Sequence, residues 1–326
     1  MNPHSVSALA RAAVLAALLA PVGAALAQDY PAKPVTLVVT YPPGGGADLM
    51  ARLVAPKLAE ALGQPVVVEN KPGAAGQVGA GFVANARPDG YTVMVDAASF
   101  VINQSLYPSL PYDAGKAFRT VGVLAAFPHV IVVTPGFEAK SATDLVALAR
   151  AKPGAISYAS SGTGSAQHLA GATFLRQTGT QMTHVPYKGG GPAMNDVMGG
   201  HIPVFFANIA SGLAHIRGGK LRALAVASDR RVAALPGTPA TGELGVGGPV
   251  VYEWNGLFVP AGTPDAILAR LAGAFDKAMA DPQVRQRIAD LGGELVGGGV
   301  DGANKFIAGQ RDLTGALIRE GNIRPD

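Results

Sequence analysis

In the first third of the chain, continuous apolar runs alternate with stretches in which apolar residues recur at near-helical spacing. A short continuous apolar run, Val35 to Val39, precedes a stretch from Leu49 to Leu62 in which leucines recur at near-helical spacing. The runs Val66 to Asn70 and Tyr91 to Val95 follow, with a short helical stretch, Gln77 to Ala86, between them. A continuous apolar run followed by a helical pattern is typical of a parallel strand that helices cover on both faces. The order predicts half of a doubly wound α/β domain, in which ligands bind at the carboxyl ends of the strands.

The same alternation starts again after an irregular stretch, residues 100–118. The strands predicted in the second part are Ile156 to Tyr158, Met182 to Val185, His201 to Phe206 and Leu221 to Val226. Helices are predicted before and between them, and three more, over 264–280, 282–291 and 302–319, are expected to pack on the first part. Two extended segments, one broken at Pro128 and one over Tyr252 to Val259, are predicted to cross between the two parts. We therefore expect two lobes: residues 28–128 with 252–326, and residues 129–251.

Two glycine-rich turns stand where a predicted strand passes into a helix. The first turn includes Tyr41 to Asp48, and the second turn is Ser160 to His168. The first NH groups of a helix have no partner inside it, and they lie at the positive end of the helix dipole. Each turn therefore predicts half of an anion site, and two such turns on separate lobes predict a cleft that holds a small carboxylate.

The amino terminus has the pattern of a secretory signal peptide. Arg11 precedes the apolar run Ala12 to Ala20, and the small residues Ala25 to Ala27 precede Gln28. That apolar run is shorter than the ~20 residues that a membrane-spanning helix needs. We expect cleavage after Ala27 and a mature protein outside the cytoplasm.

Composition limits the kinds of site that the chain can form. Without cysteine it has neither disulfides nor thiolate metal ligands. The 26 lysine and arginine residues, one of them Arg11, nearly balance the 22 aspartate and glutamate residues. Because no dense basic run is interleaved with aromatic residues, nucleic acid is not the expected partner. A mature chain of this length is expected to form two cores, at ~100–200 residues per domain.

Four motifs in one order resemble the Bug family, the periplasmic solute-binding components of tripartite tricarboxylate transporters. These motifs are Tyr41 to Asp48, Val68 to Ala74, Pro88 to Thr92 and Val185 to Gly189. The resemblance covers the whole mature chain. It implies a periplasmic, Venus-flytrap-like α/β protein whose two lobes, each a doubly wound sheet with flanking helices, close on a small organic acid. It also implies delivery of the acid to membrane permease subunits. We expect a monomer that has no cofactor and no metal.

The resemblance also implies a set of ligand-binding positions on the two turns. Members of the family hold ligand carboxylates there through backbone NH groups, hydroxyls and ordered water. The corresponding positions are Tyr41, Gly45, Ala47 and Asp48 in the first lobe, and Ser160, Thr163, Gly164, Ser165 and His168 in the second. Ser99, Tyr187 and Asn208 are added because they follow predicted strands. Many members carry an acidic residue where this chain has Ala207, so an amino-acid ligand is less expected than an organic acid.

Other interpretations of these residues remain open. Asp48 and Ser165 could only cap their helices, and His168 could only pack in a first turn. A hydrolase would need Gly-x-Ser-x-Gly at a strand-to-helix turn, and the second turn lacks that spacing. Gly79 to Ala84 nominally fits a dinucleotide pattern, but it lies inside a predicted helix. The six histidines show no paired metal spacing. A ligand sensor that docks on a signalling receptor would share the same cleft.

Overall fold

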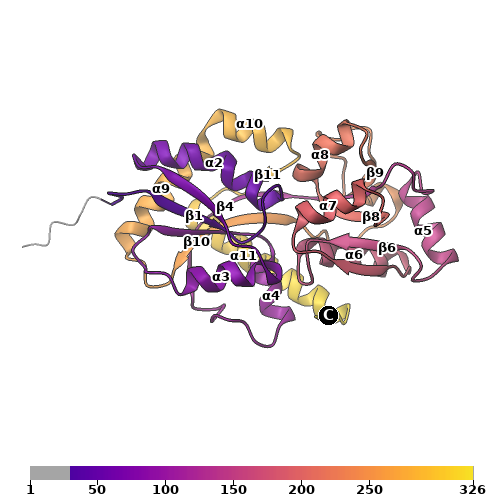
Figure 1. The fold of residues 1–326 in the computed structure, drawn as a ribbon, viewed down its shortest axis with the longest axis horizontal. Helices are drawn as coiled ribbons and strands as arrows, with labels where there is room; N and C mark the ends of the chain where they lie inside the picture. The colour runs from indigo at the N-terminus through magenta and orange to yellow at the C-terminus, as the bar shows by residue number, and fades with distance from the viewer. Residues whose placement is uncertain (1–29, 326) are drawn as a thin grey trace, which may run out of the picture.

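The computed structural model describes residues 30–325, which form two lobes side by side along the long axis of the molecule (Figure 1). Each lobe is built on one β-sheet with helices on both faces. This arrangement confirms the predicted two-lobed α/β fold. The predicted signal peptide, residues 1–27, lies outside the described residues.

The first sheet has six strands, and its centre comes from the alternation at the start of the chain. In order across the sheet they are β11 (Glu294–Leu295), β4 (Phe118–Phe127), β10 (Glu253–Pro260), β3 (Thr92–Asp96), β1 (Val35–Val39) and β2 (Val66–Asn70). β1 pairs in parallel with β2 and β3, whereas β10 runs antiparallel between β3 and β4. The sheet is therefore mixed, with a long returning strand beside its parallel part.

Side chains of β1 alternate between two cores because neighbouring residues of a strand point to opposite faces. Leu37 and Val39 pack with the helices α2 (Gly46–Leu62) and α9 (Asp265–Ala280). Val38 packs on the other face, toward the remaining first-lobe helices. Those are α3 (Gln77–Ala84), which follows the 3-10 turn η1 (Ala74–Gly76), α4 (Ser99–Leu106) and α11 (Gly299–Glu320). The helix α10 (Pro282–Asp290) packs on α9.

The helix α4 corrects one expectation, because residues 100–118 were predicted to be irregular throughout. Phe100, Val101 and Ile102 of α4 are buried in the core. The pattern concealed this helix because β-branched and aromatic residues are weak helix formers and no side chain caps its start. Tertiary burial therefore decides the conformation here.

The second sheet has five strands and is also mixed. Their order is β7 (Thr183–Pro186), β6 (Ser157–Ser160), β8 (Val204–Asn208), β5 (His129–Val133) and β9 (Arg222–Ala227). β6 pairs in parallel with β7 and β8, and β5 runs antiparallel to β8 and β9. The helices of this lobe are α5 (Ala142–Ala151), α6 (Ala166–Thr178), α7 (Gly190–Met198) and α8 (Ile209–Arg217), with the 3-10 turn η2 (Gly242–Leu244) after β9.

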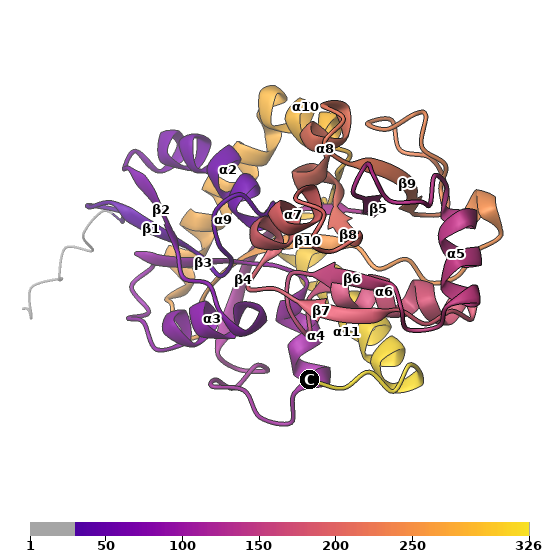
Figure 2. The same cartoon turned by 45° about the vertical axis from the view of Figure 1, so that its right-hand side comes forward.

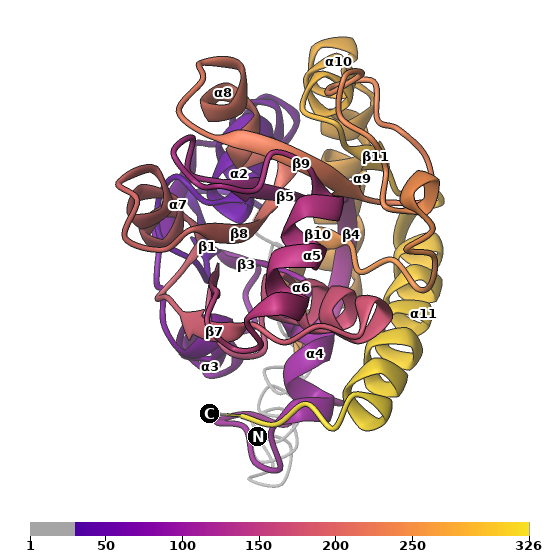
Figure 3. The same ribbon diagram turned by 90° about the vertical axis from the view of Figure 1, so that its right-hand side faces the viewer.

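The chain passes between the sheets at Pro128 and again before Glu253. β4 ends at Phe127 in the first sheet, and β5 begins at His129 in the second. The Nδ1 atom of the buried His129 lies 2.9 Å from the Val251 carbonyl oxygen, which joins the two crossings. On one side of the molecule α11 runs beside α4 and also contacts α6 of the second lobe (Figure 3).

Candidate functional site

Two adjoining cavities lie between the lobes. The inner cavity measures about 20 Å³, and its lining residues are Tyr41, Gly45, Gly46, Ala47, Ala97, Ser161, Gln167, Gly190, Ser211 and Glu253. The outer cavity measures about 290 Å³, shares Tyr41 and Ser161 with the inner one, and is further lined by Gly73, Ala74, Ala75, Gly76, Tyr107, Gly162, Thr163, Pro186, Tyr187 and Lys188. Both cavities lie where strands of the two sheets end, as predicted for an α/β fold.

Several helices begin at the inner cavity. α2 starts at Gly46 and α7 at Gly190, and no side chain caps either helix. Gln167 and Ser211 lie in the first turns of α6 and α8. The helix dipoles make this region favourable for negative charge. Among the described residues that line the inner cavity there is no lysine or arginine, so its positive potential comes from the backbone.

Asp48 orders the first turn and lines neither cavity. Its carboxylate accepts hydrogen bonds from Gly44 NH at 3.0 Å, Asn70 Nδ2 at 2.9 Å and Arg52 Nε at 3.0 Å. Although burial alone would raise the pKa of Asp48, these hydrogen bonds hold it below its ordinary value. The structure therefore favours the architectural role of Asp48, while Gly45 and Ala47 of the same turn line the inner cavity.

Tyr41 belongs to a buried polar cluster behind the first turn. Burial, together with the nearby Asp96 and Glu253, raises its pKa, and Ser99 hydrogen bonds to it. Asp96 Oδ1 accepts hydrogen bonds from Thr40 Oγ1 at 2.6 Å and from Ala97 NH at 2.7 Å. Burial raises the pKa of Asp96 to about 6 against these hydrogen bonds. Ser99 thus supports Tyr41 from behind and is itself absent from the cavity lining.

The second turn is held by its own side chains. Ser165 caps α6, because its Oγ accepts a hydrogen bond from His168 NH at 3.2 Å. Ser160 Oγ lies 2.7 Å from His184 Nε2, and the rings of His168 and His184 stack with centroids 4.0 Å apart. These three predicted residues are buried and outside the cavity lining, so they fix the turn whose Ser161 and Gln167 face the inner cavity.

Thr163, Gly164 and Tyr187 lie where the lobes approach each other. Tyr107 of the first lobe donates a hydrogen bond to the Thr163 carbonyl oxygen at 3.2 Å. A Cβ at Gly164, which has φ +80°, would lie 2.9 Å from Asn103 Oδ1 of α4. Tyr187 lines the outer cavity and donates its hydroxyl hydrogen to Asp196. The start of α7 also faces the first lobe (Figure 2), since a Cβ at Gly191 would lie 3.0 Å from the Pro43 carbonyl oxygen.

Asn208 is the last of the predicted residues, and it contacts the opposite lobe. Its Oδ1 accepts a hydrogen bond from Ala210 NH at 2.8 Å and caps α8. Its Nδ2 lies against the start of α2, so that a Cβ at Gly46 would approach it to 2.5 Å. The first turns of α2 and α8 are therefore in contact across the cleft.

The sequence patterns missed several lining residues, of which Glu253 differs most in chemistry. Gly46, Ser161 and Gln167 lie within the two predicted turns but were not selected. Glu253 begins β10 and is only 4% exposed. An acidic residue in an otherwise apolar crossing segment was the available signal, because buried carboxyl groups rarely occur without a specific role.

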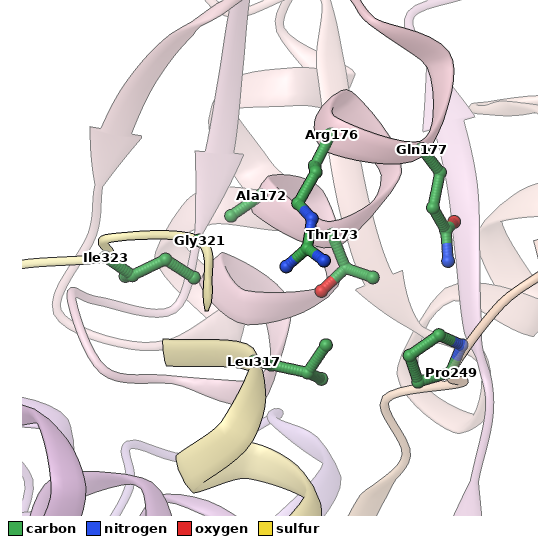
Figure 4. A pocket seen from close by; sticks show the side chains of 8 residues that line it. All are labelled: Ala172, Thr173, Arg176, Gln177, Pro249, Leu317, Gly321 and Ile323. Carbon is green, nitrogen blue, oxygen red and sulfur yellow. The ribbon is translucent and has the colours of Figure 1, made fainter. Parts of the chain in front are cut away.

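A third cavity of about 50 Å³ lies away from the cleft, between α6 and the end of α11 (Figure 4). Thr173 and Arg176 of α6 point toward Leu317 of α11 there. Arg176 pairs with Glu320 at 2.8 Å, and both side chains are about half exposed. This cavity has neither the strand ends nor the glycine-rich turns that define the cleft.

Comparison with known proteins identifies the family. The sequence profile described as "Tripartite tricarboxylate transporter family receptor", TctC, matches residues 50–323. The chain belongs to this family. It is 36% identical over 307 residues to Protein BugT of Bordetella pertussis, covering 94% of this chain and 93% of that protein. The resemblance to the Bug family is thereby confirmed.

Solved structures agree with the family assignment. The periplasmic binding protein BugD superposes with a TM-score of 0.87 at 32% identity, covering 91% of this chain and all of that one. An R. palustris protein solved with adipate gives a TM-score of 0.87 at 30% identity, with the same coverage. TctC relatives are thus binding proteins, and one of them holds a dicarboxylate.

Two further observations concern residues 30–325. No group of three or more histidine, cysteine, aspartate or glutamate side chains in this part is arranged to hold a metal ion. No helix of the same part is both long and apolar enough to cross a membrane.

Proposed function

We propose that this TctC protein is an extracytoplasmic receptor that captures a small di- or tricarboxylate, or a related organic acid, between its lobes. The convergence of the first turns of α2, α6, α7 and α8 on one cavity supports this proposal most directly. Several helix N-termini on one small space favour an anion without any cationic side chain. The binding proteins of this family, including the one solved with adipate, support it further.

Closure of the lobes is the proposed mechanism of capture. The proposed lobes are residues 28–128 with 252–326 and residues 129–251, and the proposed hinge is the pair of crossings at Pro128 and before Glu253. A ligand that accepts hydrogen bonds from both turns gains them together only when the cleft is shut, so binding favours the closed state. The first-lobe contacts come from Tyr41, Gly45 and Ala47, while Asp48 orders their turn.

The second-lobe part of the proposed site lies around α6 and the ends of its neighbouring strands. Thr163 and Tyr187 line the outer cavity, whereas the remaining predicted residues hold the backbone that a ligand would contact. Those supporting residues are Ser160, Gly164, Ser165, His168 and Asn208, while Ser99 supports Tyr41 in the first lobe. We further propose that the protein acts in the periplasm as a monomer, without enzymatic activity, and delivers its acid to the permease subunits of a tripartite transporter.

Thermal unfolding of residues 28–326 with a panel of acids tests this proposal. The panel contains malonate, succinate, malate, adipate, citrate, benzoate and aspartate, each at pH 7. An acid at about a hundred times its Kd should stabilise the folded protein by ~2.7 kcal/mol and raise Tm. Analysis of the same samples for consumed acid separates binding from turnover. A panel without any rise in Tm, or with turnover of one acid, would contradict the proposed function.

A further inference from the structure

Glu253 places a carboxyl group in the wall of a cavity that otherwise favours anions. It is the first residue of β10, lies at the second crossing between the lobes, and pairs in register with Phe127 of β4. Among the described lining residues of the inner cavity, Tyr41 and Glu253 are the ones with ionisable side chains. An ionised carboxylate here would repel an anionic ligand, so its protonation state matters for binding.

The hydrogen-bond partners of Glu253 are donors. Ala98 NH donates to its Oε1 at 3.3 Å, and the backbone NH of Trp254 and the side chain of Gln167 in the second lobe also hydrogen bond to it. Ser161 Oγ donates to Gln167 Oε1 at 2.6 Å, which leaves the amide NH₂ of Gln167 to face Glu253. None of these partner atoms can accept a hydrogen bond. A proton on the Glu253 carboxyl therefore has no acceptor among these partners and is available to a group in the cavity.

Charged and titratable groups around Glu253 also favour its protonated form. Asp96, at the end of β3, lies nearby, and Tyr41 approaches from the end of β1. Burial raises the pKa of Glu253 to about 8, opposed by the hydrogen bond from Ala98 and reinforced by Asp96. α6 contributes the neutral Gln167. No lysine or arginine from the described lining faces the carboxyl, so nothing in the wall offsets the cost of its ionisation.

We propose that Glu253 binds the ligand as a carboxylic acid and donates its hydrogen to a carboxylate of the bound organic acid. The protein thus takes up an anion together with a proton held on Glu253. The hydrogen bond between a neutral acid and a carboxylate is charge-assisted and short. This inference rests on the proposed function and specifies the chemistry of the same site.

The test measures Kd against pH by calorimetry, from pH 6.5 to 9.5. The probe is the acid among succinate, malate and adipate that raises Tm most, since both carboxyl groups of each acid titrate below pH 6.5 and are largely ionised over this range. If only protonated Glu253 binds, affinity stays nearly constant at low pH and falls about tenfold per pH unit above the pKa of the carboxyl. Glu253→Gln keeps a neutral donor and should bind with an affinity that is flat across this range.

Two controls keep the test decisive. Glu138→Gln removes an exposed carboxylate beyond the far end of β5 and should retain the wild-type pH profile. Wild-type calorimetry at pH 8.5 in buffers of different ionisation enthalpy should show proton uptake on binding, even if Glu253→Gln folds poorly.

The outcomes separate the inference from the proposed function. A wild-type affinity that is independent of pH, or a pH dependence that persists in folded Glu253→Gln, would overturn the role of Glu253 while leaving the receptor function standing. An affinity that rises with pH would show that the protein binds the acid when Glu253 is ionised. That result would also overturn the role of Glu253. Binding of none of the three acids at pH 6.5 would overturn the role of Glu253, and no response to any acid of the larger panel would overturn the proposed function as well.

Discussion

Several buried polar residues that were predicted to contact the ligand instead cap helices or order the first turn. Ser165 and Asn208 accept hydrogen bonds from the backbone of the helices that they cap, and Asp48 accepts three around the first turn. Each such interaction satisfies donors that would otherwise be unpaired at a buried helix start. The polar side chains that line the inner cavity are therefore other ones, Tyr41, Ser161, Gln167, Ser211 and Glu253.

Residue chemistry explains why the site was predicted only in part. Glycine and serine in Tyr41 to Asp48 and Ser160 to His168 indicated helix starts that bind anions, and both turns do border the cavities. Spacing alone cannot say whether a hydroxyl such as that of Ser165 points to a cavity or back to its helix. Glu253 escaped detection because β10 comes from a distant part of the chain, and only the folded sheet places it beside Gln167.

The buried His129 gives a prediction about pH. Burial lowers its pKa to about 4, opposed by the hydrogen bond with the Val251 carbonyl, so His129 is neutral in the folded protein at pH 7. Its unfolded value is near 6.5. The contribution of His129 to the free energy of unfolding should therefore be complete above about pH 6.5 and decline as pH falls toward 4, by up to ~3 kcal/mol at 1.4 kcal/mol per unit. Asp96 and Glu253, whose pKa values are raised, act in the opposite direction over this window, so a comparison with a variant isolates the contribution of His129.

Urea unfolding at pH values from 4.5 to 7.5 measures this decline. The free energy of unfolding of the wild type minus that of His129→Gln should fall between pH 6.5 and 4.5, whereas the same difference for His201→Gln, which replaces an exposed histidine, should not change with pH. Parallel curves for the wild type and His129→Gln would contradict the assignment.

At the scale of elements, the apolar pattern predicted most strands of both sheets because they are short runs rich in apolar residues. The second-sheet strands β6, β7, β8 and β9 lie within a few residues of their predicted positions, except that β8 begins at Val204 rather than His201. The pattern could not predict α4, since its burial between the sheet and α11 depends on residues more than two hundred positions away. Elements with strong local patterns are predictable, and elements fixed by tertiary packing are not.

The contact between α2 and α8 predicts how one methyl group affects closure. A Cβ at Gly46 would lie 2.5 Å from Asn208 Nδ2, whereas a Cβ at Gly45 meets only the Pro42 carbonyl oxygen at an ordinary 3.6 Å. Gly46→Ala should therefore weaken binding of the panel acid about tenfold, because either the lobes stay apart or Asn208 leaves its cap, at ~1 kcal/mol. Gly273→Ala in α9 is the matched control, because its Cβ would meet nothing within 4 Å and it lines neither cavity. The Kd of this variant should change by no more than about threefold.

Equal Kd values for the two alanine variants would show that the α2–α8 contact does not limit closure. Thermal unfolding without ligand distinguishes an effect of the substitution on closure from an effect on folding, since neither variant should lose more than ~1 kcal/mol of stability.

At the scale of the whole molecule, the lobes are connected by two crossings and by α11. The crossings meet at His129 and Val251, and α11 packs on α4 while it contacts α6. The contact with α6 includes the Arg176–Glu320 pair, whose exposure limits it to ~1 kcal/mol or less. The two crossings are the proposed hinge, and the extent of closure should depend on what the cleft binds.

Small-angle scattering of residues 28–326 tests this dependence directly. A compact chain of this size has a radius of gyration of about 19 Å, and closure on a saturating acid should reduce the measured value by an amount on the order of 1 Å. Gly46→Ala should show a smaller reduction at equal saturation, because the methyl group separates α2 from Asn208. Glu320→Gln, which removes only the exposed pair with Arg176, should contract as the wild type does. A radius that is unchanged by a saturating acid would mean that the lobes are already closed without ligand, and capture would then require a different route into the inner cavity.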